Sequence, residues 1–524
     1  MPLLFLAVVL VAPAVRLMLE GGSADLWAPW QDPYLRGRLL WSLAQAAMTC
    51  GLVLLIGLPM GWVLARLDFP GRGLLLRGLM LPFVVPTLVA AMGVLALMGP
   101  RGLLAQWGGP DLQGTPWLLL FGNLFFNLCV LVRAAVDALS QVSAARVAAA
   151  RSLGATPWRA FWRVEWPAIA PWLASALCLV FLYCFAGFGL ALILGGQDYA
   201  TVEVEIYTLV AHELELGQAG VLAVWMLLLT GAVALAYAWL EKRLAAPGRV
   251  SPVARQRPRS WAQWVSVGAA LAVLFVVCAA PLLAIVWRAA QALLGGQGAA
   301  VLFEADTRAA LWNTLRFTAL ALTLATVLGL THALAVRALD VASLQRHASE
   351  ARGVLALAWR AAAFLPFVVS PVTVAFGLLL LYPDWTASLA LLVAAYALLA
   401  YPFVAKSLTA ALDSLPASYA QAAATLGARP WRVLWRVTLP LVAPALRRGM
   451  AFAAATALGE FAVTLFLSRP EWTTLTTLIY QHLGRPGAAN LDAALVLACV
   501  LMGLALAAFT LLEGPAQKDN DAHA

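Results

Sequence analysis

Apolar stretches that are long enough to cross a lipid bilayer recur along the whole chain, and short segments between them carry most of the charge. A spanning helix needs about 20 predominantly apolar residues, and about 12 stretches meet this condition. They form two sets of six on either side of a polar segment, so the pattern predicts an all-α polytopic membrane protein. The first set begins near Leu3, Leu39, Gly78, Trp117, Leu173 and Gly220, and the second near Gln263, Ala309, Ala361, Ser388, Met450 and Leu491.

The composition supports a membrane protein. Hydrophobic residues make up 63% of the chain and charged residues 11%, whereas soluble domains average about 45–50% and about 25%. A single soluble core stops growing at roughly 250–300 residues, so one such core does not explain 524 residues of this kind. The first apolar stretch lacks the basic n-region of a signal peptide, and we count it as a span.

The polar segment between the two sets, residues 243–262, is rich in proline and arginine. Basic loops stay in the cytoplasm, so we predict a cytoplasmic linker here, with the net charge of +9 reflecting membrane orientation instead of nucleic-acid binding. An even number of spans in each half then places both termini in the cytoplasm. The predicted organisation is a first repeat over residues 1–242, a second over 263–512 and a cytoplasmic tail over 513–524.

Cysteine and histidine residues give no sign of a metal centre. The six cysteines lie inside apolar stretches, form no CxxC pair and have no histidine at metal-ligand spacing. The five histidines are scattered, and no cluster of His, Asp and Glu has catalytic spacing. We therefore predict no metal site and no catalytic residues.

One polar, aromatic segment occurs twice. Residues 150–173 read ARSLGATPWRAFWRVEWPAIAPWL and residues 423–446 read AATLGARPWRVLWRVTLPLVAPAL. Gly154 aligns with Gly427, an offset of 427 − 154 = 273. Each copy follows the fourth span of its half, and six spans separate equivalent points, so the two halves form a parallel repeat.

Each copy predicts an elbow of two short helices. Ser143 is a good N-cap, Gly154 is the residue type that ends a helix in a left-handed conformation, and Thr156-Pro157 restarts one. Pro167 and Pro171 are expected to interrupt the second helix. An interfacial anchor also explains the tryptophans, though not the repeated glycines. In the second copy the equivalent residues are Ser414, Pro416, Gly427 and Pro430.

The two elbows resemble the EAA loop of ATP-binding-cassette importer permeases: Glu-Ala-Ala, three residues, Gly, nine residues, an aliphatic residue, any residue, then Leu-Pro. The match covers residues 143–172 and 414–446, with Ala148 and Gln421 in place of the leading glutamate. In that family the loop docks on an ATPase subunit and passes its closure to the membrane helices. The resemblance therefore implies coupling roles for Ala149, Ala150, Gly154, Pro157, Pro167, Ala422, Ala423, Gly427, Pro430 and Pro440.

The same resemblance implies a type I importer permease fold in a bacterial inner membrane, two copies of a cytoplasmic ATPase and a periplasmic or extracellular substrate-binding protein. The chain itself has no P-loop, because none of its three lysines, Lys242, Lys406 and Lys518, follows a glycine. We therefore expect no cofactor on this chain, and ATP to be used by the partner.

Several stretches are similar to thiamine permeases, among them residues 30–35, 124–133, 162–167, 184–196 and 200–209. Ferric-iron permeases, which also have two fused halves, are the alternative. A proton-coupled secondary transporter is a further alternative, since residues 68–72 contain Asp-x-x-Gly-Arg, but that class has no elbow after the fourth span. Acidic residues of the opposite loops, Asp198, Glu203 and Glu205, are candidates to receive the binding protein.

Glu460 is a carboxylate inside an apolar stretch, where charge is costly and usually functional. At the repeat offset it corresponds to Gly187, since 460 − 273 = 187, and Phe461 corresponds to Phe188. A carboxylate with aromatic neighbours suits a cation in transit, so we predict that Glu460, Phe461 and Phe188 line the translocation pathway. A structural hydrogen bond to a neighbouring helix is the alternative.

Overall fold

The computed structural model describes residues 1–22, 25–244, 251–295, 298–343, 355, 358–386, 388–467 and 469–513. Ten helices within these ranges are long and apolar enough to cross a membrane, which confirms the predicted all-α polytopic fold. Parts of the predicted linker and tail, residues 245–250 and 514–524, lie outside the described residues. The ten helices are Pro2–Gly21, Pro33–Arg66, Thr87–Gln106, Pro116–Ser140, Pro157–Phe185, Leu216–Leu240, Trp261–Leu294, Ala305–Asp340, Leu389–Ser414 and Ala488–Glu513.

The third span of each half differs from the prediction. In both halves the sequence LPFV forms a four-residue helix, α6 (Leu81–Val84) and α21 (Leu365–Val368). A proline soon follows, and the main helices are α7 (Thr87–Met98) and α22 (Pro371–Leu381). Because proline disfavours helical conformation in the residue before it, each apolar stretch is divided, and the spans predicted near Gly78 and Ala361 begin later. α22, with 11 residues, is not among the ten long helices.

The chain packs as two compact units, residues 18–298, here the first-half unit, and residues 1–17 with 299–524, here the second-half unit. The first span of each half therefore belongs to the unit of the other half. Gly93 lies so close to the Pro281 carbonyl that an added Cβ would be 2.9 Å from its oxygen, and Gly377 has the same relation to Pro13. The unit boundaries thus differ from the boundaries of the sequence repeat.

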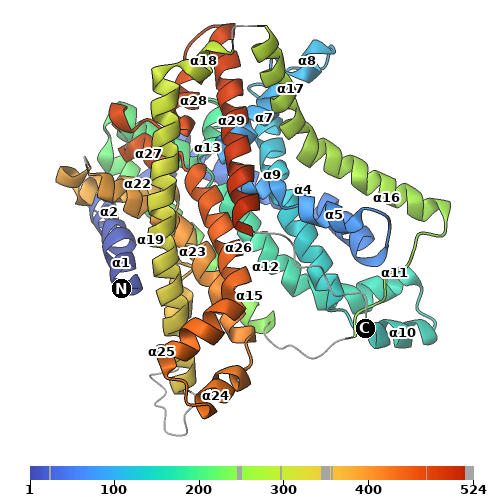
Figure 1. The fold of residues 1–524 in the computed structure, drawn as a ribbon. Coiled ribbons are helices and arrows are strands. Elements are labelled where there is room, and N and C mark those ends of the chain that lie inside the picture. The colour runs from blue at the N-terminus through green and yellow to red at the C-terminus, as the bar shows by residue number, and fades with distance from the viewer. Residues whose placement is uncertain are drawn as a thin grey trace. The chain divides into compact units, whose positions relative to one another are not determined.

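The first-half unit is built around α4 (Pro33–Arg66), which packs against α9 (Pro116–Ser140) and α12 (Trp166–Phe185), as Figure 1 shows. Leu128, Leu131 and Val132 of α9 are fully buried in this core. The other helices of the unit are α3 (Ala28–Gln31), α5 (Arg72–Gly78), α8 (Leu103–Gln106), α10 (Ala144–Ser152), α11 (Pro157–Ala160), α13 (Gly189–Leu194), α14 (Val202–Thr208), α15 (Leu216–Leu244), α16 (Trp261–Leu274) and α17 (Ala280–Leu294); α2 (Ala12–Gly22) crosses the unit boundary.

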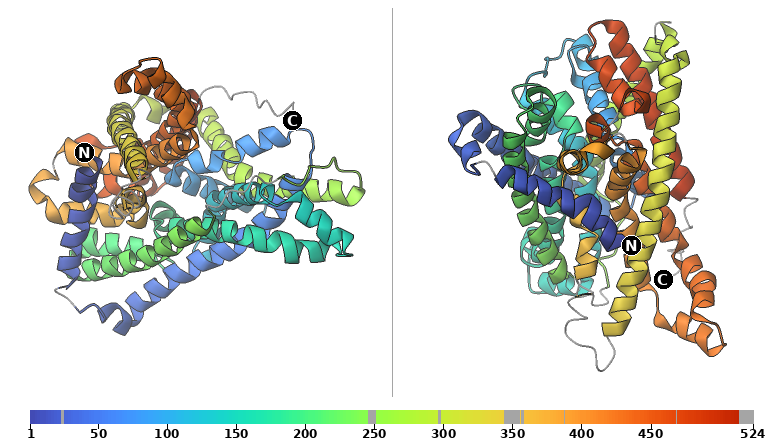
Figure 2. Two further views of the ribbon diagram at one scale, coloured as in Figure 1. Left: turned by 90° about the horizontal axis from the view of Figure 1, so that it is seen from below. Right: turned by 90° about the vertical axis from the view of Figure 1, so that its left-hand side faces the viewer.

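The second-half unit repeats this arrangement with α19 (Ala305–Ser343) against α23 (Leu389–Ser414) and α26 (Leu439–Leu458), which Figure 2 shows from two sides. Gly57 of α4 faces Leu131, and Gly329 of α19 faces Val404. These pairs are equivalent. The offset is 404 − 131 = 273 for α9 and α23, as for the elbows, and 329 − 57 = 272 for α4 and α19, one residue less. The other helices of the unit are α1 (Pro2–Leu6), α18 (Ala300–Phe303), α24 (Ala417–Thr425), α25 (Pro430–Val433), α27 (Ala462–Leu467), α28 (Leu475–Leu483) and α29 (Ala488–Glu513).

Four of the described helices contain a wide π-turn that ends two residues before a proline; three are among the ten long apolar helices, and the fourth, which runs from α25 into α26, is not, although a span was predicted near Met450. The turns are η1 (Ala7–Val11), η2 (Phe161–Glu165), η4 (Phe275–Ala279) and η6 (Leu434–Thr438), and the prolines are Pro13, Pro167, Pro281 and Pro440. Proline lacks the N–H of an ordinary helical turn, and a π-turn is a local change of hydrogen bonding that a helix accommodates. The predicted interruption at Pro167 and Pro171 is therefore wrong, because α12 continues past both.

Candidate functional site

The first elbow has the predicted local geometry. The Ser143 hydroxyl accepts a hydrogen bond from the backbone N–H of Arg146 at 3.4 Å and caps α10. Gly154 ends the turn with a φ of +83°. Thr156 then caps α11 by accepting from the backbone N–H of Arg159 at 3.3 Å. Composition and spacing alone were sufficient to locate these turns.

The second elbow repeats the turn. Gly427 has a φ of +78°, close to that of Gly154. The backbone N–H of Ala428 donates to the carbonyl of Ala423 at 3.0 Å, as that of Ala155 donates to Ala150 at 3.1 Å. These bonds satisfy carbonyl groups that the end of a helix leaves without a partner. The predicted alanines Ala150 and Ala423 thus take part in the turn through their backbones.

Each elbow presents large apolar side chains to its surroundings. Leu153, directly before the glycine of the first elbow, is 89% exposed, and Leu426 of the second is 88% exposed. Trp158 and Trp431 are 71% and 68% exposed. Clustered exposed apolar surface marks a contact with another protein or a membrane. Sequence reasoning left the two leucines out of the site, although their recurrence at the 273-residue offset was a usable signal.

The residues predicted to line a pathway lie at a break in each fifth span. α12 ends at Phe185 and α13 begins at Gly189, and α26 ends at Leu458 and α27 begins at Ala462. Phe188 is 4% exposed and Phe461 2%. Their rings contact tyrosines at equivalent positions, Tyr207 and Tyr480, with centroids 5.5 and 5.3 Å apart. The structure therefore gives both phenylalanines the same packing partner within their own halves.

Glu460 is buried in the second of these breaks, with 8% of its surface exposed. Its Oε1 accepts a hydrogen bond from the backbone N–H of Val463 at 2.9 Å, so the carboxylate caps α27. Its backbone carbonyl accepts from the Thr476 hydroxyl at 3.0 Å and lies 3.4 Å from the Tyr396 hydroxyl. The hydrogen bond of the Glu460 carboxylate is thus local, and the contacts with neighbouring helices are made by its backbone carbonyl, so the role of Glu460 in the pathway stays a prediction.

In the first half an amide network occupies the same place. The Asn123 side chain donates to Gln45 Oε1 at 2.7 Å, and Gln45 donates to the carbonyl of Cys184 at 2.8 Å. Asn123 is the equivalent of Tyr396, because 396 − 123 = 273. The break in the second half is therefore contacted directly by Tyr396 of the fourth span, whereas in the first half Asn123 of the fourth span acts through Gln45 of α4, which bonds the broken helix.

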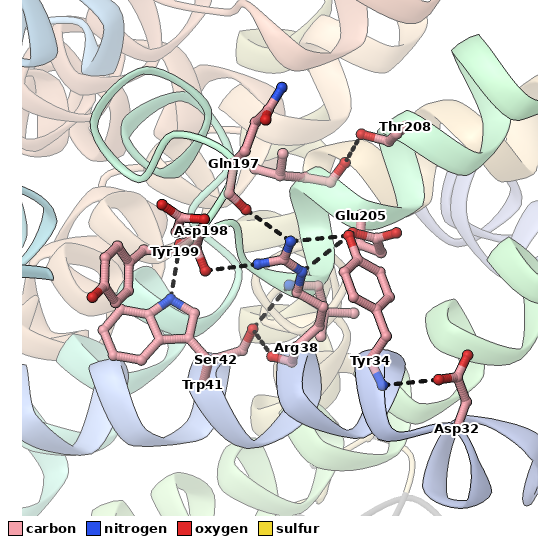
Figure 3. Close-up of polar contacts among 12 residues, drawn as sticks. Asp32, Tyr34, Arg38, Trp41, Ser42, Gln197, Asp198, Tyr199, Glu205 and Thr208 are labelled. Carbon is pink, nitrogen blue, oxygen red and sulfur yellow. Dashed lines mark hydrogen bonds and ion pairs between the residues drawn. The ribbon is translucent and has the colours of Figure 1, made fainter. Parts of the chain in front are cut away.

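A second polar cluster, the rim cluster of Tyr34, Arg38 and Glu205, lies at the start of α4 (Figure 3). Arg38 donates to the carbonyls of Asp198 and Gln197 at 2.9 and 2.7 Å, and its Nε lies 3.5 Å from Oε2 of Glu205. The Tyr34 hydroxyl donates to the same carboxylate oxygen at 2.9 Å. The cluster fastens the segment after α13 to α4.

Burial dominates the electrostatics of this cluster. The Glu205 side chain is 6% exposed. Burial raises its pKa above the ordinary value, while the hydrogen bond from Tyr34 and the charge of Arg38 oppose this rise. The Oε2 oxygen of Glu205 is thus engaged within the chain, and the contact of Glu205 with a binding protein stays a prediction. Asp198 contributes its backbone carbonyl to the cluster.

Comparison with known proteins gives a consistent result. The sequence profile described as "Binding-protein-dependent transport system inner membrane component" matches residues 57–246 and 351–512, one region in each half. The chain is 29% identical over 523 residues to the thiamine transport system permease protein ThiP of Escherichia coli K12, covering 97% of this chain and 94% of that protein. It is 26% identical to ThiP of Haemophilus influenzae, and 28% identical to ThiP of Brucella abortus 2308, covering 92% of this chain and 89% of the relative in both cases.

Proposed function

Since this chain belongs to the family of binding-protein-dependent transport system inner membrane components and is a permease of the ATP-binding-cassette importer type, we propose that it carries thiamine or a phosphate of thiamine. Support for this ligand comes from the relatives named as thiamine permeases, which align with up to 97% of the chain. Ferric iron is the other ligand considered, and the uptake experiment below separates the two.

The two elbows are proposed to couple the chain to separate ATPase subunits. The observation that supports this most strongly is the repetition of one geometry: a left-handed glycine at 154 and 427, preceded in each case by an exposed leucine. An anchor in lipid needs aromatic and basic side chains but no such turn. Two equivalent loops fit two copies of one ATPase, each docking on one elbow.

Transport is proposed to proceed by alternating access. A substrate-binding protein delivers the ligand to the side of the membrane opposite the elbows. Closure of the two ATPase subunits on ATP moves the elbows and opens the pathway toward the binding protein, and hydrolysis returns it to the inward-facing state. We place both termini in the cytoplasm of a bacterium, because the basic residues gather in the loops that contain the elbows. Protease accessibility of terminal tags in membrane vesicles checks this orientation.

Uptake of labelled thiamine tests the proposal in cells that lack their own importer and receive this chain, its binding protein and its ATPase. Wild type should accumulate thiamine. Gly154→Val and Gly427→Val should each reduce uptake to background, because a β-branched residue is a severe outlier at positive φ. Gly73→Val is the matched control, since Gly73 has no positive φ and open space around its Cβ position.

Two results would contradict parts of the proposal separately. Normal uptake by both elbow variants would remove the coupling role, and absence of thiamine uptake by an assembled wild-type complex would move the ligand to ferric iron. The same assay examines Glu460→Gln, which keeps the oxygen that caps α27 and should transport normally. A raised KM for thiamine in that variant would instead assign the carboxylate to the pathway.

A further inference from the structure

Arg66 is the last residue of α4, and its guanidinium forms an ion pair with Glu165 at the end of the first elbow. Nη2 of Arg66 donates to Oε2 of Glu165 over 2.7 Å. The two side chains are only 9% and 11% exposed. Glu165 is the last residue of the π-turn η2, directly before α12 begins at Trp166. The pair therefore joins the elbow, where it enters the membrane helix, to a neighbouring helix.

The described part of the linker connects the same arginine to the start of the elbow. The backbone N–H of Gln256 donates to the Arg66 carbonyl at 2.9 Å, and that of Asp68 donates to the Gln256 carbonyl at 2.9 Å. Earlier in the linker, the carbonyl of Ser251 accepts from the N–H of Ala144, the first residue of α10, at 3.0 Å. Arg66 thus reaches one end of the elbow through its side chain and the other through the linker backbone.

Near the end of α19 the corresponding arginine, Arg337, lies one residue earlier in the aligned sequence than Arg66 does in α4. Leu67-Asp68 recurs as Leu339-Asp340, since 339 − 67 = 272, so Ala338 stands at the position of Arg66. One residue turns a side chain by about 100° around a helix. Arg337 accordingly donates to a different neighbour, the carbonyl of Leu412 near the end of α23, at 2.9 Å.

The second elbow also lacks the acidic partner. Thr438 stands at the position of Glu165, because 438 − 165 = 273, and it is buried. With alanine and threonine at these two positions, the ion pair has no counterpart in the second half. The two elbows share a turn and an exposed surface, yet within the described ranges only the first elbow is joined to the second span of its half by a buried ion pair.

We propose that Arg66 is a positioning residue of the first elbow and that its pair with Glu165 transmits the movement of that elbow to α4 as well as to α12. This inference rests on the proposed coupling role of the elbows. Desolvation of two buried charges offsets most of their attraction, so such a pair contributes a defined orientation more than stability. In the second half no such pair reaches the start of α26 among the described residues, and the connection to α19 there is the more exposed pairing of Arg360 with Asp340 and Asp413, near the end of α23.

The test measures thiamine uptake and ATP hydrolysis together in proteoliposomes that contain the complete complex. The variant Arg66→Met with Glu165→Leu replaces the pair by apolar side chains, a change that commonly leaves folding intact. We expect its thiamine transported per ATP to fall about tenfold, within the usual range of coupling between two sites. The charge-swapped variant Arg66→Glu with Glu165→Arg should recover most of that loss.

Two control variants should leave the ratio unchanged. Thr438→Val alters the equivalent position of the second elbow, and Arg133→Met removes an ion pair with Asp137 whose side chains are 47% and 54% exposed. A merely structural role predicts reduced assembly with an unchanged ratio, and that result would overturn the inference. If the apolar variant does not assemble, the swapped variant decides: a ratio of thiamine to ATP far below that of wild type in an assembled complex would overturn the inference.

The outcome is distinguishable from failure of the proposed function. A normal ratio in the apolar variant, with uptake abolished by Gly154→Val, removes the role of Arg66 and leaves the elbows as coupling loops. Normal transport in both removes the coupling role itself, and the inference with it.

Discussion

α4 and α19 each bind the loop that follows the broken fifth span of their own half through an equivalent neutral hydrogen bond, and in the part of the chain that the structure describes α4 alone adds buried charges to that contact. The Ser42 hydroxyl accepts from the backbone N–H of Val202, and the Thr314 hydroxyl from that of Leu475, both at 2.9 Å. Val202 and Leu475 are the first residues of α14 and α28. The N–H groups of a first helical turn have no partner within the helix, so a hydroxyl from another helix supplies one in both halves.

The charged part of the rim cluster is present in one half only. Ala310 stands at the position of Arg38, since 310 − 38 = 272, and Leu478 at that of Glu205, since 478 − 205 = 273. In the second half Asn313 donates to the carbonyls of Glu471 and Thr473 at 2.9 and 3.0 Å. Asn313 stands at the position of Trp41, since 313 − 41 = 272, and the indole N–H of Trp41 donates to the carbonyl of Tyr199 at 2.8 Å. Both halves thus hold the loop with neutral donors from the helix, and the first half adds the charged donors of Arg38.

The largest effect is expected from Arg38→Leu. The change leaves the Glu205 carboxylate buried without a cation and the carbonyls of Gln197 and Asp198 without these donors. Removing one partner of a buried ion pair costs about 3–5 kcal/mol, and thermal unfolding of the purified chain in detergent measures the loss. Arg36→Leu on the same helix is the control, because Arg36 is exposed and should change stability little.

A contrary result would revise the comparison. If Arg38→Leu and Arg36→Leu unfold alike, the charges of the first half contribute nothing that the neutral bonds do not already provide. The second half would then represent the complete requirement for holding the loop.

Removing the hydroxyl acceptor that both halves share should lower the stability by an intermediate amount that is equal in the two halves. Ser42→Ala and Thr314→Val each leave a buried N–H without its acceptor, at a cost of about 1–3 kcal/mol. The same unfolding measurement on the two variants tests the equality. A much larger loss in one half would show that the two hydroxyls do not have equivalent roles.

The local features of the elbows were predictable because they depend on residues close in sequence. The left-handed glycines at 154 and 427, the Ser143 and Thr156 caps and the proline after the turn follow from the conformations those residue types favour. The family assignment depended on the same short pattern and is confirmed by the profile match in both halves. The π-turns were missed because proline was taken as a helix stop, whereas a wider turn accommodates it.

Contacts between distant residues gave no comparable signal. Arg66 and Glu165 are separated by 99 residues, and nothing in either local sequence identifies the partner. The exchange of the first spans between the units depends on small residues at crossing points, such as Gly93 against Pro281. The cap formed by Glu460 is local, three residues from Val463, but a carboxylate inside an apolar stretch is equally typical of a ligand site, so the sequence did not distinguish the two roles.

The smallest effect on stability is expected from Glu205→Gln. The direction in which this effect changes with pH follows from the raised pKa of Glu205. Burial is the largest cause of that rise, so the folded chain holds the proton more tightly than the unfolded chain does. The stabilisation from this group is therefore full below the ordinary pKa and is lost as the pH rises through the raised pKa. Glutamine resembles the protonated acid and can still accept from Tyr34, so the variant should differ from wild type by less than about 1 kcal/mol.

Unfolding temperatures of wild type and Glu205→Gln, measured from acidic to neutral pH, check this sign. The unfolding temperature of the variant should rise relative to that of wild type as the pH rises, because only wild type loses the contribution of the protonated acid. A variant that instead falls behind at neutral pH would show that the attraction between Arg38 and an ionised Glu205 outweighs the cost of burial. In that case the ion pair of Arg38 and Glu205 stabilises the first half, and the second half, with Leu478 in place of the acid, lacks that stabilisation.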